Sequence, residues 1–498
     1  MGIELARKAE GFGKRLAIDG SGGTAAYSEL LARSGAVAAA LLSDRDDLRD
    51  RRVAFLVPPG VDHVAVRWGI WRAGGMAVPL ALSHPEPELE RAVAGCEPTA
   101  LVGSEVEAER LRGIAGRAGI ELLAVPALSA EAAAVVLPEV APDRPALMVY
   151  TSGTTGSPKG VVTTHSMVQA QITALAQAWG WRADDRILHV LPLHHVHGMI
   201  VAMDTALWSG ACCEFSAPFD ADVVWERLAS GDITVFMAVP TIYGRLIRTW
   251  EGASDEARAR WSRGVAGLRL MTSGSASLPV STMERWQEIT GHRLLERYGM
   301  TEIGMALSNP LDGERREGSV GQPLPGVEAR IVDRAGIEVA EGTSGQIEVR
   351  GPQVFREYWR RPEETATAFR EGWFMTGDEG LLEDGYHRIL GRRSVDIIKT
   401  GGYKVSALEI EEALRHHPAI ADVAVVGVAD EEWGECVCAA IVVEGNDEPR
   451  PEVLRGWCKE RLAPYKVPRR IRYLDQLPRN SMGKVTKPAI HGYFPAGV

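Results

Sequence analysis

Several features are missing from this 498-residue sequence. No apolar stretch reaches the roughly 18 residues that a membrane-spanning helix needs, so no membrane span is expected. The net charge is −11, which argues against a nucleic-acid partner, because such a partner requires a basic surface. The six cysteines include no C-x-x-C pair, and the segment MGIELARKAE lacks the apolar core of a secretory signal. A reducing compartment, the cytoplasm, is therefore expected.

Lysine is scarce as well. Nine lysines stand against 46 arginines. Lysine carries a compact point charge, whereas arginine carries a planar fork of donors. A lysine that this arginine-rich chain retains therefore indicates a position at which the point charge itself is needed.

Apolar strands alternate with helical segments between about residues 52 and 296. Strands are expected at 53–58, 77–80, 146–150, 186–190, 211–215, 233–239 and 268–272, and helices at 61–73, 166–179 and 220–230. This alternation predicts an α/β protein with mostly parallel, helix-covered sheets. Short strands and Gly/Pro turns at 318–390 predict a more β-rich piece.

A smaller unit is expected near the C-terminus. Helices at 406–416 and 451–462 and strands at 420–428 and 437–443 predict an α+β unit of about a hundred residues. The sequence thus predicts a large N-terminal domain, 1–391, and a small C-terminal domain, 392–498.

The strongest motif is YTSGTTGSPKGV at 150–161. An apolar strand runs into a loop of small and hydroxyl residues, whose backbone and side-chain donors suit an anion. Lys159 adds a mobile positive charge. The spacing differs from G-x-x-x-x-G-K-[ST], so this is a different type of phosphate loop. Its candidate phosphate-binding residues are Thr151, Ser152, Gly153, Thr154, Thr155, Gly156, Ser157, Pro158 and Lys159.

This loop resembles the phosphate loop of the adenylate-forming superfamily, which includes acyl-CoA synthetases. Four further motifs of that family occur in the expected order along nearly the whole chain. They are YGMTE at 298–302, TGD at 376–378, GR at 391–392 and PRNSMGK at 478–484. The resemblance implies ATP, Mg²⁺ and coenzyme A as cofactor and co-substrates, and a small domain that rotates about a hinge within 393–396.

Each of these motifs also has a physical interpretation. Tyr298 offers a flat face to a base, Thr301 a donor to a phosphate, and Glu302 a hard oxygen ligand to Mg²⁺. Asp378 offers two acceptors to the ribose hydroxyls, and by resemblance Arg392 reaches the same ribose.

Two lysine-bearing loops complete the catalytic prediction. By resemblance, Lys484 bridges the substrate carboxylate and the α-phosphate during adenylation, where it stabilises developing negative charge. The loop at 399–405 resembles the segment that moves in for thioester formation. Its residues Gly401, Gly402, Tyr403 and Lys404 form the candidate coenzyme A loop, and a simple Gly-rich turn before a helix is the alternative interpretation.

The same resemblance identifies residues around the adenine and around the acyl pocket. Gly274, Ser275 and Ala276 match the turn around the adenine, and Ser273 and Met300 are counted with the substrate-binding residues.

A histidine cluster, LPLHHVHG at 191–198, suggests a metal site at first sight. A strand-to-loop passage is expected to direct the three side chains apart, which disfavours metal binding. By resemblance His195 is a gate residue near the acyl pocket.

Arg245 in VPTIYGRL carries the prediction of substrate class. Thr241 is expected to cap a helix after a buried strand, which puts Arg245 one turn in, near a cleft. Together with LPLHHVHG and KTGGYKVSALE, this segment resembles the sequences of malonyl-CoA synthetases, most closely those of the animal mitochondrial type. The resemblance implies that Arg245 pairs with the free carboxylate of malonate or methylmalonate and rejects long acyl chains.

Three alternatives remain open from the sequence. One is a short- or medium-chain monocarboxylate synthetase, and another is an adenylating enzyme that loads a separate carrier protein. From a different class, a catalytically silent nucleotide-binding regulator is disfavoured by the presence of Lys484, Glu302 and Lys159 together.

Overall fold

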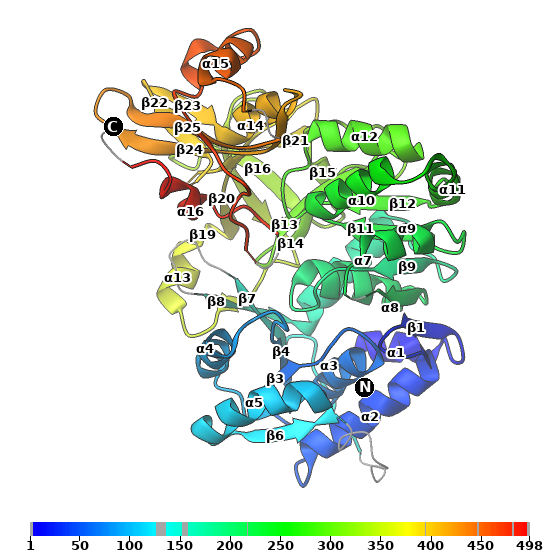
Figure 1. Cartoon of the computed structure of the whole chain (residues 1–498). Coiled ribbons are helices and arrows are strands. Elements are labelled where there is room, and N and C mark those ends of the chain that lie inside the picture. The colour runs from blue at the N-terminus through cyan, green and yellow to red at the C-terminus, as the bar shows by residue number, and fades with distance from the viewer. Residues whose placement is uncertain are drawn as a thin grey trace.

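The structure is a computed structural model that describes residues 3–125, 136–151, 158–216, 218–393, 395–445, 448–480 and 483–495. Figure 1 shows a large body that contains the N-terminus and a smaller body, orange to red, that contains the C-terminus. Among the described residues, no helix has the length and apolar character to cross a membrane.

One large sheet is parallel at its centre and antiparallel at both edges. Parallel pairing runs from β1 through β10, β9, β11 and β12 to β13. In spatial order its strands are β15 (Gln322–Pro323), β14 (Gly304–Ser308), β13 (Leu295–Met300), β12 (Leu270–Ser273), β11 (Val235–Ala238), β9 (Arg186–His189), β10 (Cys212–Phe215), β1 (Leu16–Gly20) and β2 (Ala25–Ala26). The carboxyl ends of β11, β12 and β13 therefore meet at one edge of this sheet.

A second sheet carries the end of the phosphate loop. Antiparallel β7 and β8 flank that loop, and the remaining central strands pair in parallel. Its order is β18 (Glu357–Tyr358), β8 (Lys159–Thr164), β7 (Pro145–Thr151), β4 (Met76–Pro79), β3 (Arg52–Leu56), β5 (Ala100–Gly103) and β6 (Glu121–Ala124).

Helices form three layers around these two sheets. One layer packs on the outer face of the second sheet, one lies between the sheets, and one covers the outer face of the first sheet. The outer layers are α4 (Glu86–Cys96) with α5 (Glu105–Ala118), and α9 (Ala221–Leu228) with α10 (Pro240–Gly252), α11 (Asp255–Val265) and α12 (Val280–Thr290). The middle layer holds α1 (Glu4–Glu10), α2 (Tyr27–Leu42), α3 (Val61–Arg72), α7 (His165–Ala178), the π-helix η1 (His197–Asp204) and α8 (Thr205–Trp208).

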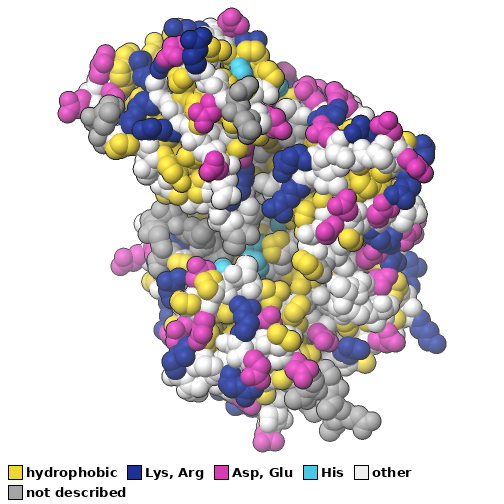
Figure 2. Space-filling model, in the orientation of Figure 1, with side chains coloured by type: hydrophobic (Ala, Val, Ile, Leu, Met, Phe, Trp, Pro, Cys, Tyr) yellow, Lys and Arg dark blue, Asp and Glu magenta, His cyan; other side chains and the backbone are white. Residues whose placement is uncertain are grey.

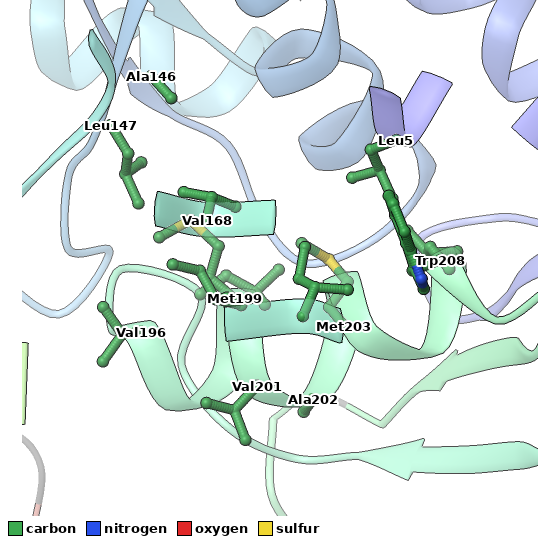
Figure 3. Close-up of a cluster of buried hydrophobic side chains, with 14 of the residues drawn as sticks. Leu5, Ala146, Leu147, Val168, Val196, Met199, Val201, Ala202, Met203 and Trp208 are labelled. Atoms are coloured by element: carbon green, nitrogen blue, oxygen red, sulfur yellow. The ribbon is translucent and has the colours of Figure 1, made fainter. Parts of the chain in front are cut away.

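The π-helix η1 is the centre of the middle layer. All eight of its residues are buried, and Figure 3 shows Met199, Val201 and Met203 of η1 among apolar side chains that include Val168 of α7. Packing from several elements at once therefore fixes the segment that directly follows the histidine cluster.

The rest of the chain forms two further sheets. The antiparallel sheet comprises β16 (Glu328–Val332), β17 (Gly345–Arg350), β20 (Trp373–Glu383), β19 (Phe369–Arg370) and β21 (Tyr386–Arg392), with α13 (Pro362–Thr367) beside it. The C-terminal body comprises β23 (Tyr403–Ser406), β22 (Ile397–Thr400), β25 (Gly434–Val443), β24 (Ile420–Asp430) and β26 (Arg470–Tyr473). Its helices are α14 (Ala407–Arg415), α15 (Pro451–Lys459), the 3₁₀ turn η2 (Pro464–Lys466) and α16 (Lys487–His491), and it has its own apolar cores.

The predicted α/β architecture is confirmed, with differences at element ends. The expected helix at 61–73 is α3, and the expected strand at 268–272 is β12, which begins two residues later and ends one residue later. The expectation that Thr241 caps a helix is wrong. Helix α10 begins at Pro240, because proline's fixed φ and missing N–H suit the first helical position, and no side chain caps it.

Candidate active site

Lys484 lies in a tight turn that packs against the large body. Its backbone N–H donates to the side-chain oxygen of Asn480 at 3.0 Å, and its carbonyl accepts from the Asn480 N–H at 2.9 Å. A Cβ added at Gly483 would lie 3.2 Å from the hydroxyl of Thr241, in the first turn of α10. Gly483 has φ +77°, which glycine adopts without strain. Backbone geometry thus holds the lysine turn at the N-terminal end of α10.

Charged groups surround the Lys484 amine. Burial lowers the pKa of Lys484, the guanidinium groups of Arg297 and Arg392 lower it further, and Asp378 opposes them. On a chain of net charge −11, this local excess of positive charge favours an anionic ligand. Figure 2 shows a hollow between the C-terminal body and the helices α10–α12, with Lys or Arg side chains on its rim.

Asp378 is held by the two residues that were expected to share the nucleotide with it. The Tyr298 hydroxyl donates to Oδ2 at 2.5 Å, and Arg392 Nε lies 3.2 Å from Oδ1. Burial raises the pKa of Asp378, while Arg392 and Tyr298 lower it. Three predicted residues from β13, β20 and β21 therefore converge, and Asp378 presents the acceptor pair that a ribose requires.

Glu302 lies in a connected chain of polar groups. Its Oε1 accepts from the Tyr358 hydroxyl at 3.0 Å. Burial raises the pKa of Glu302, against the opposing effects of Tyr358, Arg392 and Lys159. Lys159 in turn lies over the Tyr358 ring, with its amine 4.8 Å from the ring centroid. Glu302 and Lys159, which belong to two separate motifs, therefore flank one aromatic ring.

Arg297 is a candidate residue that the sequence analysis missed. It is 2% exposed, and none of its three guanidinium nitrogens has a hydrogen-bond partner among the described residues. Burial lowers the pKa of Arg297 to about 9. An unpaired buried charge costs several kcal/mol, so its presence beside Lys484 indicates an anionic ligand. The available signal was a charged residue inside a buried strand, directly before Tyr298.

The turn after β12 brings Ser273 and Gly274 to the same region. Ser273 is fully buried, and its hydroxyl has no partner among the described residues. A Cβ at Gly274 would collide with the Arg297 guanidinium, so glycine is required there. Ser275 adopts φ +68° and its hydroxyl lies 3.2 Å from His197 Nδ1, while Ala276 is exposed.

The histidine cluster differs from the expected geometry. The rings of His194 and His195 lie together, with centroids 4.0 Å apart, so the chain does not direct these two side chains apart. The reason is that His194 and His195 lie in a turn and not in extended backbone, while His197 begins η1 and contacts Ser275. Among the described residues, no three metal-ligating side chains gather into a site. Burial and the nearby Lys484 charge hold the pKa of His195 well below its usual range.

Arg245 lies on α10 with its side chain exposed, rather than enclosed in a pocket. Its guanidinium carbon is 5.9 Å from the centroid of the Phe219 ring. Arg245 follows Thr241 by four positions, so both occupy the face of α10 that packs near the Lys484 turn. The expected neighbourhood is therefore present, but solvent screens this charge more than that of Arg297.

The candidate coenzyme A loop is a β-hairpin turn. Gly401 at φ +55° and Gly402 at φ +83° connect β22 and β23, with Thr400 paired to Tyr403. Positive φ at both central positions is the geometry of a type I′ turn. Tyr403 stacks on Tyr465 at 4.1 Å, and Lys404 Nζ lies 3.1 Å from Glu379 Oε1. The two glycines therefore form a hairpin turn, and strand β23 separates that turn from helix α14.

The remaining predicted residues lie at the ends of strands. Thr151 pairs with Lys159 across β7 and β8, and Pro158 directly precedes β8. Met300 ends β13, and Thr301 lies in the turn to β14. The predicted loop residues Ser152, Gly153, Thr154, Thr155, Gly156 and Ser157 lie outside the described residues.

Buried neutral histidines near the site predict an acid-sensitive stability. Burial lowers the pKa of His63 to about 3, below the ordinary value of about 6.5 that it regains on unfolding. Because the folded-state pKa is depressed, this stabilisation is present above about pH 6.5 and lost as the pH falls. At pH 5 the loss is roughly 2 kcal/mol. Calorimetry should therefore show the Tm of His63→Gln rising by a few °C relative to wild type between pH 7 and pH 5. The exposed His491→Gln control should show a constant difference, and the same constancy for His63→Gln would contradict the prediction.

Comparisons with known proteins agree with this arrangement. The model of the AMP-binding enzyme family matches residues 5–359, and the model of the AMP-binding enzyme C-terminal domain matches residues 409–484. The chain is 43% identical to the mitochondrial malonate–CoA ligase ACSF3 of Homo sapiens, over 98% of this chain and 91% of that protein. It is 44% identical to the malonate–CoA ligase of Arabidopsis thaliana, over 88% of this chain and 77% of that protein.

A solved structure shares the whole fold. The ATP-bound MatB of Rhodopseudomonas palustris superposes with a TM-score of 0.91 at 35% identity, and the match covers 99% of each chain.

Proposed function

This chain belongs to the AMP-binding enzyme family, and from that premise we propose that it ligates malonate, and also methylmalonate, to coenzyme A. The proposed route is an acyl-adenylate, with AMP and pyrophosphate released. The observation that carries the choice of acid is the buried guanidinium of Arg297. Its nitrogens have no hydrogen-bond partner among the described residues, and it lies close enough to lower the pKa of Lys484. The malonate–CoA ligases among the relatives support the same substrate.

The first proposed step is attack of one malonate carboxylate on the α-phosphorus of ATP. Lys484 is positioned to stabilise the negative charge that builds on the reacting oxygens. Asp378 and Arg392 hold the ribose, and the turn at 273–276 lines the adenine. The protein contributes mainly orientation and charge stabilisation, because pyrophosphate is already an activated leaving group.

The carboxylate of Glu302 fits a magnesium ion. Mg²⁺ is usually held by one or two carboxylates together with substrate phosphates, and Glu302 offers a hard oxygen beside the Lys159 and Tyr358 side chains. When bound, the ion would neutralise charge on the phosphates. Tyr358 would keep Glu302 oriented toward it.

The free carboxylate of malonate is assigned to Arg297, with Arg245 at the entrance. An anion would satisfy the Arg297 nitrogens, which are buried and make no hydrogen bond within the part of the chain that the structure describes. A monocarboxylic acid would leave this charge unpaired and would bind less well. Arg245 is exposed, so its assigned role is to attract the second charge rather than to enclose it.

The second proposed step is attack of the coenzyme A thiol on the adenylate after the C-terminal domain rotates. The division into 1–391 and 392–498, with a hinge within 393–396, and the role of the loop at 401–404 are parts of this proposal. The cytoplasm is the proposed compartment, and its support is that all six cysteines are buried and unpaired.

A panel of acids tests this function directly. Pyrophosphate release should be fastest with malonate, followed by methylmalonate, and at least about tenfold slower with propionate and butyrate at equal concentration. Malonyl-CoA and AMP should form in equal amounts. Faster turnover of butyrate would support a monocarboxylate synthetase instead. Adenylate formation without transfer to coenzyme A would support loading of a carrier protein.

A further inference from the structure

Glu364 contacts the lysine that is assigned to the phosphates of ATP. Its Oε2 lies 2.5 Å from Lys159 Nζ, and its Oε1 lies 2.5 Å from Arg361 Nη1. The side chains of Lys159 and Glu364 are 19% and 36% exposed, so water only partly screens this pair. Lys159 is thus bound by a carboxylate at the position where the proposed reaction needs it to bind a phosphate.

Backbone pairing fixes the place of Glu364. Strand β18 pairs antiparallel with β8, and Trp359 N–H donates to the Gly160 carbonyl at 2.7 Å. Helix α13 follows at once, and the Thr365 hydroxyl ties its first turn to Tyr358 N–H at 3.0 Å. The start of α13 is therefore brought beside the start of β8, where Lys159 stands. The contact follows from strand register, not from the reach of two long side chains alone.

We propose that Glu364 competes with the phosphates of ATP and pyrophosphate for Lys159, and so weakens the binding of both. The ammonium group of lysine is a point charge, and a carboxylate next to it repels an incoming phosphate. Before ATP binds, Lys159 must leave Glu364 or share its charge with it. After adenylation, Glu364 reclaims Lys159 as pyrophosphate leaves. This inference rests on the proposed function, within which Lys159 of the phosphate-loop motif binds the phosphates of ATP.

The neighbouring residue supplies a matched control. Glu363 stands beside Glu364 in the first turn of α13, so both have the same relation to the helix dipole. Its side chain is exposed and forms no ion pair with any residue that the structure describes. Glu363→Gln and Glu364→Gln therefore change the net charge equally, but only the second releases Lys159.

Three constants test this proposal. They are the KM for ATP, the inhibition constant of pyrophosphate, and the dissociation constant of magnesium pyrophosphate measured by calorimetry. Glu364→Gln should lower all three constants by about two- to fivefold, the range expected for a partly exposed ion pair. Glu363→Gln should leave them within about 1.5-fold of wild type. In a Lys159→Met background, Glu364→Gln should give no further gain, because the competed group is gone.

Other outcomes overturn the inference in distinguishable ways. If Lys159→Met weakens pyrophosphate binding but Glu364→Gln leaves it unchanged or weaker, the phosphate role of Lys159 stands and the competition is wrong. If both glutamate variants tighten binding equally, the effect is one of overall charge. If Lys159→Met leaves all three constants unchanged, the phosphate assignment fails together with the inference.

Discussion

The Lys484→Ala variant should lose malonate-dependent pyrophosphate release by on the order of 10²–10³-fold, the cost of removing one donor that stabilises transition-state charge. The same variant should still convert supplied malonyl-AMP and coenzyme A to thioester at within about tenfold of the wild-type rate. The reason is that the amine faces the region of Asp378, Arg297 and Arg392, where adenylation is assigned. Measuring the two half-reactions separately checks this prediction.

A matched lysine variant controls for disturbance of the C-terminal body. Lys459 lies exposed on α15, and Lys459→Ala should affect neither half-reaction. An equal loss in both half-reactions of Lys484→Ala would show that the lysine supports the fold or the domain arrangement rather than adenylation.

The Arg297→Met variant should lose at least about 30-fold in kcat/KM for malonate, because removing one partner of a buried charge pair costs roughly 2–5 kcal/mol. For propionate, kcat/KM should hold or rise, since the unpaired buried charge is gone. Methionine fills similar space without a charge, so the Tm should not fall. Steady-state kinetics with both acids, together with a thermal melt, measures all three expectations.

The Arg245→Ala variant provides a comparison for Arg297→Met. Because its side chain is exposed, Arg245→Ala should lower malonate kcat/KM by less than Arg297→Met does. A larger effect at Arg245 would mean that the exposed arginine, not the buried one, holds the free carboxylate. A proportional loss for malonate and propionate in Arg297→Met would mean that Arg297 only supports the strand.

The main architecture could be predicted because each buried strand is a separate apolar stretch in the sequence. Every residue of β4 and every residue of β3 after Arg52 is buried, for example, and α3 between these strands starts at the residue expected from the pattern. A parallel strand covered on both faces has this signature regardless of its partner. The convergence of Tyr298, Asp378 and Arg392 was predicted from the family motifs, because the apolar pattern of strands and helices carries no information about it.

The rest depended on contacts between segments that are distant in sequence. The π-helix η1 forms within an apolar stretch that also fits a strand or an α-helix, and packing against α7 and α8 decides its geometry. The pairing of Lys159 with Glu364 depends on the register of β18 against β8.

One of the few lysines outside the catalytic motifs, Lys487, is also held at a buried position. Lys487 is buried at the start of α16, with Nζ 2.6 Å from Asp396 and 2.8 Å from Glu411. Asp396 also accepts from the backbone N–H of Arg392 at 3.0 Å. The two carboxylates raise the pKa of Lys487 despite burial, which lowers it. The Lys487 ammonium therefore connects helix α16, which follows Lys484, to Asp396 of the expected hinge region.

We expect the wild-type enzyme to select malonate through a charge pair between the free carboxylate of malonate and Arg297. The most direct measurement compares kcat/KM for malonate and for monomethyl malonate, which lacks that charge, on wild type and on Arg297→Met. The wild type should prefer malonate by at least about 30-fold, and in the variant the ratio of the two kcat/KM values should be within a few-fold of one. The same ratio in both enzymes would contradict it.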